Sequence, residues 1–146
     1  MKKRYVINTN DVEGFSIPGD EDIYVSKLLI DKESVGSKRI SMSYFMLKPG
    51  KKTEPGIHPC PFDEVYFIVK GKGIVYLGED SEEYEISTDS VVFIPCGLKH
   101  GLKNTGDSNL ELLGIFPYQF KNGVNGIYDE RIKSWGKSFK FIKDDV

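Results

Sequence analysis

The 146-residue sequence lacks the features that mark several large protein classes. Its apolar runs are short: Val65 to Val69 is among the longest, far below the roughly 20 residues that cross a bilayer. Its 20 basic and 22 acidic side chains give a formal net charge of −2, so no general attraction to nucleic acid or to an anionic membrane is expected. Two cysteines are too few for the multi-bridge framework of a small secreted protein.

The N-terminal segment also lacks the apolar core of a signal peptide. Residues 2–4 are basic, but the polar residues Asn8, Asn10 and Asp11 follow before any apolar stretch develops. We therefore expect a cytoplasmic protein with neither a nucleic-acid nor a membrane partner.

The residues that are present predict one β-rich domain. Apolar residues make up 39% of the chain, and 15 Gly, 7 Pro and 18 aromatic residues accompany them. Short apolar stretches separated by turn residues predict strands at 23–30, 39–47, 65–69, 74–77, 91–94, 100–104 and 110–116. No helical periodicity precedes residue 126, whereas Ile127 to Trp135 has helix-compatible spacing. An antiparallel sandwich or barrel with a short C-terminal helix follows.

Three local expectations accompany these strands. Residues 74–77 are expected to return as the hairpin partner of 65–69, and the acidic residues from Glu79 to Glu85 are expected to form a solvated turn. The stretch from Val65 to Val69 is apolar on both faces, so its outer face needs cover. A terminal segment or a second copy of the chain could provide that cover, and we expect the second copy, which predicts a homodimer.

Both histidines of the chain lie in motifs with regular spacing. The first motif runs from Gly56 to Gly71 and the second from Pro95 to Asn104. The pattern resembles the two motifs of the cupin superfamily, and the residues that match in spacing are His58, Glu64, Gly71, Pro95, Gly97, His100 and Asn104. The turn Lys48-Pro49-Gly50, which often precedes the first motif in that family, is also present.

The resemblance implies an all-β fold, the cupin double-stranded β-helix or jelly-roll barrel, with one metal site inside. It covers about residues 40–116, with N-terminal strands in 1–39 and a C-terminal extension in 117–146, all within a single cupin domain at 1–146. Proteins of this kind are commonly homodimers. Three positions depart from the pattern: Cys60 stands at the second histidine position, Asp89 stands where the second motif opens with glycine, and Gly56 lies closer to His58 than the usual leading glycine.

The spacing also predicts a metal site on physical grounds. His58, Cys60 and Glu64 are separated by even intervals, so an extended chain would project all three side chains to one face, and His100 would arrive from another strand. Two imidazoles and one carboxylate suit a single divalent metal ion such as Fe, Mn, Ni or Zn. We take His58, Cys60, Glu64 and His100 as the candidate ligands.

Cys60 has three alternative roles. As a thiolate ligand it would complete a closed tetrahedral zinc shell, which is typical of structural sites. As a pocket wall or reactive thiol it would leave positions of the metal open. A disulfide with Cys96 is the third alternative, and a reducing cytoplasm disfavours it.

The pocket beyond the metal is expected to be lined from two strands. After Glu64 the inward alternation continues through Tyr66 and Ile68, whereas on the preceding strand either Tyr44 and Met46 or Ser43 and Phe45 face inward. The predicted pocket residues are Tyr66, Tyr44, Met46 and Ile68.

These features favour a metal-dependent enzyme that acts on a small organic molecule, as a dioxygenase, isomerase or lyase. The alternative is a non-catalytic module that binds a small molecule or a metal. The sequence contains no recognisable substrate-recognition motif, so the substrate, the reaction and the identity of the metal stay open at this stage.

Overall fold

A computed structural model describes residues 4–58, 60–117 and 126–145. Strands dominate this part of the chain, and its elements in chain order are η1 Thr9–Asp11, β1 Tyr24–Ile30, α1 Lys32–Val35, β2 Ile40–Leu47, β3 Glu64–Lys70, β4 Lys72–Leu77, β5 Glu82–Ser87, β6 Val91–Ile94, β7 His100–Asn104, β8 Leu110–Pro117, α2 Gly126–Trp135 and η2 Ile142–Asp145. The helices within these ranges are all too short or too polar to cross a membrane.

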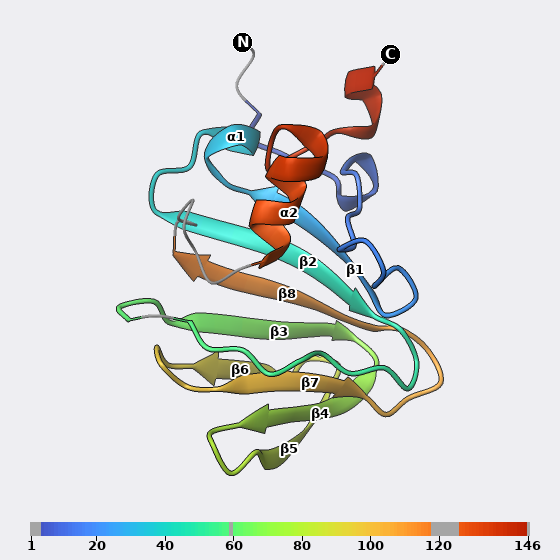
Figure 1. The fold of residues 1–146 in the computed structure, drawn as a ribbon, viewed down its shortest axis with the longest axis vertical. Coiled ribbons are helices and arrows are strands. Elements are labelled where there is room, and N and C mark those ends of the chain that lie inside the picture. The colour runs from blue at the N-terminus through green and yellow to red at the C-terminus, as the bar shows by residue number, and fades with distance from the viewer. Residues whose placement is uncertain (1–3, 59, 118–125, 146) are drawn as a thin grey trace.

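The strands form two antiparallel sheets (Figure 1). The larger sheet has the order β1-β2-β8-β3-β6 and the smaller one the order β5-β4-β7. Each expected strand is present, and so is the short C-terminal helix, α2, which confirms the all-β expectation.

The main core lies between the two sheets. It includes Ile68 of β3 and Leu112 of β8 from the larger sheet, and Val75 of β4 and Leu102 of β7 from the smaller one, all at most 3% exposed. Burial of a side chain of this size contributes about 1.5–3 kcal/mol, so this apolar layer holds the sheets together. The metal-site candidates lie at the edge of the same layer.

The link between β3 and β4 differs from the expected hairpin. β3 pairs with β6 and β8, whereas β4 pairs with β5 and β7, so the two strands belong to different sheets. The chain crosses over at Gly71, whose φ of 96° and close approach to the Asn109 carbonyl exclude a side chain. Apolar alternation marks a strand but does not identify its partner, which is why the hairpin prediction was wrong.

The acidic segment is also more ordered than expected. Glu82 to Ser87 forms β5, paired along its length with β4, and only Ile86 of this strand is buried. An edge strand with its carboxylates in water satisfies its backbone on one side and keeps its charges solvated. The charge cluster therefore lies on a strand rather than in a turn alone.

Segments from both ends of the chain cover the outer face of β1 and β2. Val12, Leu29 and Phe139 form a second small core, and Val12 bridges to Phe141. Helix α2 lies at the β1–β2 end of the larger sheet (Figure 1). Its Trp135 makes an edge contact with Phe15. On the cavity side of the sheet, Ile127 of α2 packs against the main core, so α2 forms one wall of the cavity described below.

Candidate metal centre and its cavity

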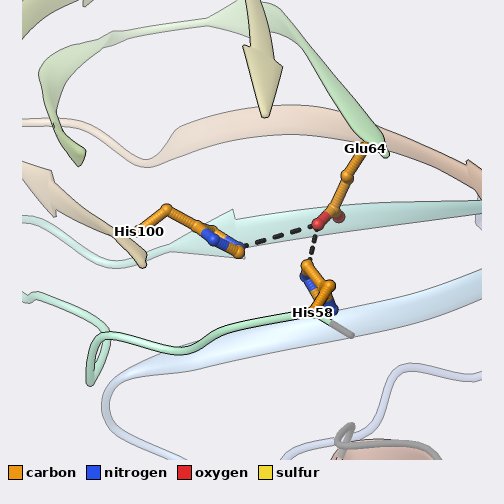
Figure 2. Close-up of side chains that lie close together, drawn as sticks. All are labelled: His58, Glu64 and His100. Atoms are coloured by element: carbon orange, nitrogen blue, oxygen red, sulfur yellow. Dashed lines mark ion pairs between the residues drawn. The ribbon is translucent and has the colours of Figure 1, made fainter. Parts of the chain in front are cut away.

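The three candidate ligands come from two sheets and one loop (Figure 2). Glu64 is the first residue of β3 in the larger sheet, and His100 is the first residue of β7 in the smaller sheet. His58 lies on the loop between β2 and β3. Because both strands begin at the same end of the interior, their side chains meet there, and the loop adds the third.

Backbone hydrogen bonds fix the loop that carries His58. Gly56 and His100 exchange reciprocal bonds of 2.8 and 2.9 Å, and the Gly97 N–H donates to the His58 carbonyl at 2.8 Å. The Cys96 N–H donates to Asp63 Oδ1 at 2.9 Å. The loop is thus held against the start of β7 and the turn before it, which positions His58 opposite His100.

The potential ligand atoms of the three side chains all lie within 4.8 Å of one another. Glu64 Oε2 is 2.5 Å from His58 Nε2 and 3.7 Å from His100 Nε2. The two imidazole rings are tilted by 35° with their centroids 4.8 Å apart. This cluster of His58, Glu64 and His100 could hold a metal ion.

The hydrogen bonding of His100 favours a metal ligand at its other nitrogen. Nδ1 lies 2.9 Å from the Leu98 carbonyl, so it carries the proton of the neutral ring and leaves a lone pair on Nε2. Burial is the main reason that the pKa of His100 is lowered, which favours that neutral form. A neutral imidazole is the form that binds metals.

His100 and Glu64 present acceptor atoms to each other in this cluster. The lone pair of His100 Nε2 faces Glu64 Oε2, and this buried oxygen receives no well-aligned hydrogen bond from the described residues, despite the short approach of His58. Two buried acceptors that face each other are unfavourable unless a cation lies between them. The donor set thus fits a divalent metal.

Glu64 also affects its other two neighbours. Hydrogen-bonding proximity to its carboxylate is the largest cause of a raised pKa at His58, and burial acts in the opposite direction. Burial, and then the negative charge of Glu64, hold the pKa of the Tyr66 phenol well above its usual value. Tyr66 therefore keeps its hydroxyl hydrogen near neutral pH.

The cluster opens into a cavity of about 240 Å³ between the sheets. Its wall combines apolar side chains from both sheets and from α2 with a comparable number of polar ones. The non-ligand lining includes Ser26, Ser43, Phe45, Thr53, Glu54, Tyr66, Leu102, Leu112, Gly114, Phe116 and Ile127. Apolar side chains that supply contact area, with polar groups that fix orientation, are the usual components of a small-molecule site.

The structure places the four predicted pocket residues differently. Tyr66 lines the cavity, but Ile68 is fully buried in the core below it. On β2 the lining residues are Ser43 and Phe45, whereas Tyr44 packs in the second core on the outer face, so the assignment of Tyr44 and Met46 to the pocket is corrected. Alternation along β2 directs either Tyr44 and Met46 or Ser43 and Phe45 into the cavity. The terminal segments supply apolar cover for the side chains that face outward.

Tyr44 has a different environment from the one expected. Burial, together with a hydrogen bond to the Glu111 carboxylate, raises the pKa of Tyr44 to about 12. Its hydroxyl is thus engaged on the outer face of the larger sheet and away from the cavity.

Cys60 is not part of the cluster in this structure. Its sulfur forms a disulfide with Cys96, with the two Cα atoms 4.8 Å apart, which corrects its assignment as a ligand and corresponds to the third alternative. The even spacing from His58 to Glu64 applies only to extended backbone, and the chain turns at Cys60 and Pro61. The turn directs the Cys60 side chain toward the second motif.

Two parts of the cavity wall had no signal in the sequence. Ser26 of β1 lines the cavity and accepts a hydrogen bond of 2.7 Å from the Arg131 guanidinium, which comes from α2. Gly114 of β8 lines it beside Glu64, where a Cβ atom would lie 3.3 Å from Glu64 Oε1. A serine in a strand and a glycine in a strand are common, so only the strand order reveals their place.

The chain matches the family model described as the cupin domain over residues 43–116. It is 32% identical over 87 residues to auxin-binding protein 1 of Arabidopsis thaliana, a match that covers 55% of this chain and 43% of that protein. It is 29% identical over 87 residues to an oxalate-binding protein of Thermotoga maritima, which covers 60% of this chain and 69% of the relative. The chain thus spans less than half of the first relative.

A solved structure extends the likeness beyond the motif region. The polyketide cyclase RemF from Streptomyces resistomycificus superposes with a TM-score of 0.69 at 23% identity, and the match covers 86% of each chain. This similarity concerns the fold alone, and it agrees with the family match. The family match, covering half of the chain, together with this agreement shows that the protein belongs to the cupin domain family and has its jelly-roll fold.

Proposed function

We propose that this protein is a metal-dependent enzyme that acts on a small organic molecule inside its barrel. His58, Glu64 and His100 would be the metal ligands, and residues 1–146 would work as a single domain. The observation that carries the proposal is the convergence of two imidazoles and one carboxylate, with ligand atoms within 4.8 Å of one another, at the wall of a 240 Å³ cavity. Three protein ligands leave positions of the metal open to a substrate, which is typical of catalytic rather than structural sites.

The metal would be one divalent ion, with Fe, Mn, Ni and Zn as candidates. When bound, it would act as a Lewis acid toward an oxygen atom of the substrate. The chain itself would contribute orientation and exclusion of water, because Phe45, Leu112 and Phe116 line the cavity into which the cluster opens. Dioxygenase, isomerase and lyase chemistry are all compatible with this arrangement.

The size of the cavity supports a small substrate. A volume of 240 Å³ is just below the roughly 300–1,000 Å³ of usual ligand pockets. Two relatives are named for binding auxin and oxalate, and RemF is named as a polyketide cyclase, so small organic molecules recur among the similar proteins.

The second candidate is a module that binds a small molecule without turnover. The names of the two binding proteins support it, and so does the replacement of a family histidine by Cys60, whose sulfur is bonded to Cys96. A binding module would hold its ligand unchanged, whereas an enzyme would convert it. Product analysis after incubation with a candidate ligand therefore separates the two.

Elemental analysis of protein purified without added metal tests the proposed site. We expect about one transition metal per chain in the wild type, and loss of that metal in Glu64→Ala. Glu54→Ala is the matched control, because Glu54 also lines the cavity but lies outside the cluster. Cys60→Ser breaks the disulfide but removes no candidate ligand, so it should bind the metal more weakly than the wild type and still retain far more of it than Glu64→Ala. A wild type that binds no metal, even when metal is added, would refute the proposal.

We also propose that two copies of the chain associate through the outer face of β3 and β6. Val91 and Phe93 of β6 are 65% and 59% exposed, and they pair in register with Phe67 and Val65 of β3. Such an exposed apolar patch is typical of an interface. Sedimentation should give a dimer in the micromolar range that Phe93→Lys dissociates and Tyr84→Lys, at an exposed aromatic elsewhere, does not. A wild-type monomer at high micromolar concentration would exclude this interface.

We retain the cytoplasm as the proposed location. In that reducing compartment Cys60 and Cys96 would be held as thiols, whereas an oxidising compartment would keep the disulfide. Alkylation of intact cells, followed by mass analysis of the purified protein, reports which form exists there. Complete protection of both cysteines would argue against the cytoplasm.

A further inference from the structure

The wall of the cavity formed by β1 and α2 carries an unusual buried charge. Arg131 of α2 is only 2% exposed, and its guanidinium donates to the Ser26 hydroxyl oxygen at 2.7 Å. Ser26 is 3% exposed and lines the same cavity as the metal-ligand candidates. A cation thus lies directly behind a hydroxyl group of the cavity wall.

No carboxylate forms an ion pair with Arg131 among the described residues. Asp31 influences it from a distance, but the Asp31 carboxylate accepts bonds from Ser34 N and Ser138 Oγ instead. Burial lowers the pKa of Arg131 to about 10, so the group stays charged at neutral pH. Because a buried charge without a counter-ion is costly, the site favours an anion nearby.

The same hydrogen bond sets the direction of the Ser26 hydroxyl. Arginine can only donate, so the Ser26 oxygen is the acceptor and its own hydrogen is directed elsewhere. Within residues 4–58, 60–117 and 126–145, that hydrogen has no assigned acceptor. A cavity-lining hydroxyl polarised by a cation is a good donor to a negatively charged oxygen.

We propose that Ser26 is a specificity-determining residue that donates its hydroxyl to an anionic oxygen of the substrate, a carboxylate or an enolate, and that Arg131 is the positioning residue behind it. The inference rests on the proposed function, since it names the class of molecule that the cavity takes. In the larger sheet, β2 and β8 separate β1, which carries Ser26, from β3, which carries Glu64. The substrate would therefore be an organic anion with one oxygen at the metal and its anionic group at Ser26.

Sodium benzoate and benzamide are suitable probes, because they have nearly the same shape and differ in charge. An arene also suits the apolar lining formed by Phe45, Leu112 and Phe116. Calorimetric titration of the protein as purified, with its metal content measured, gives both affinities. A hydrogen bond to a charged group is strong enough that Ser26→Ala should weaken benzoate binding about tenfold.

Ser43→Ala is the matched control, because Ser43 also lines the cavity and has no arginine behind it among its described contacts. We expect it to change benzoate affinity less than about twofold, as is usual for a hydroxyl without a charged partner. Arg131→Met should reduce the preference for benzoate over benzamide, and Arg131→Lys should restore part of it. A merely structural role of Arg131 would weaken both probes equally and leave the preference unchanged.

Several outcomes would overturn the proposal. They are the absence of benzoate binding to the wild type at millimolar concentration, equal effects of Ser26→Ala and Ser43→Ala, and an unchanged preference in Arg131→Met. If Arg131→Met does not fold, the comparison of Ser26→Ala with Ser43→Ala still tests the proposal. A wild type that binds no metal but shows the Ser26-dependent preference would refute the proposed function and leave this inference intact. A wild type with normal metal content and no Ser26-dependent preference for benzoate would refute this inference and leave the proposed function intact.

Discussion

Two parts of the cavity wall are built in different ways. The metal wall, formed by His58, Glu64 and His100, lies wholly within the matched region 43–116 and follows the spacing of two sequence motifs. The anion wall, formed by Ser26 and Arg131, joins residues that are 105 positions apart. Short-range spacing in the sequence thus predicts the metal wall. The residues of the anion wall come together only when the chain folds.

The two walls also differ in how they are held. A disulfide and a set of backbone bonds fix the loop of the metal wall. The anion wall depends on the packing of α2, in which Trp135 contacts Phe15 and Arg131 is buried against β1. A change that disrupts one of these walls should therefore leave the binding properties of the other intact.

Reduction of the disulfide should have the largest effect, and it should act on the metal wall. The bridge closes a loop with a sequence separation of 36, which in the chain-entropy model contributes about 4 kcal/mol to the free energy of unfolding. Treatment with dithiothreitol should lower that free energy and weaken metal binding, without changing the Ser26 dependence of benzoate binding. Urea unfolding measures the free energy of unfolding, and metal titration measures the metal affinity.

The double variant Cys60→Ser/Cys96→Ser is the control for this experiment, because the reductant should then have no effect. Thiol titration of air-purified protein should find no free thiol before reduction and two after it. Two free thiols at the outset would show that the bridge does not hold this wall.

Truncation of Arg131 should come next, and it should act on the anion wall. Arg131→Ala removes a buried side chain and its bond to Ser26, so the free energy of unfolding should fall by about 2–4 kcal/mol while the metal content is kept. Lys133→Ala on the same helix is the control, since the Lys133 side chain is 77% exposed and its loss should cost less than about 0.5 kcal/mol. Equal losses for the two variants would contradict a structural role of this wall.

The smallest effect is expected at Gly114, on the strand that separates β2 from β3. In Gly114→Ala the new Cβ would lie 3.3 Å from Glu64 Oε1, so the carboxylate must shift by a few tenths of an ångström. Metal affinity should fall modestly, with a loss of stability of about 1 kcal/mol. Gly56→Ala is matched to it, because Gly56 lines the same cavity and its Cβ would meet nothing within 4 Å. If both variants kept full metal affinity, the position of Glu64 would not depend on this contact.

The sequence was informative where chemistry and spacing coincide. His58, Glu64 and His100 could be brought together from their motif positions, and every strand of the described residues except β5 could be placed to within a few residues. Strand pairing could not be predicted in the same way, as the crossover at Gly71 shows, because alternation records only that one face of a strand is buried. The exposed carboxylates of β5 concealed a strand for the related reason that an edge strand needs few apolar residues.

Side-chain direction was the other limit. Tyr44 and Ser43 are adjacent, and the choice of which faces the cavity depends on what covers the outer face of β2. The direction of the Cys60 side chain depends on a turn at Pro61, whereas the prediction from even spacing to Glu64 assumed an extended chain. Ser26 and Arg131 gave no signal, because neither residue has a partner near it in the sequence.

The position of Arg131 has a consequence for the order of events during synthesis. In chain order all eight strands of the described residues precede α2, so a ribosome releases them before it releases that helix. The sheets with their three ligand residues can therefore assemble first, while the Ser26 hydroxyl has no arginine to orient it. The barrel would then be able to bind a metal before it could discriminate between an anion and a neutral molecule. It would gain that selectivity only when α2 docks.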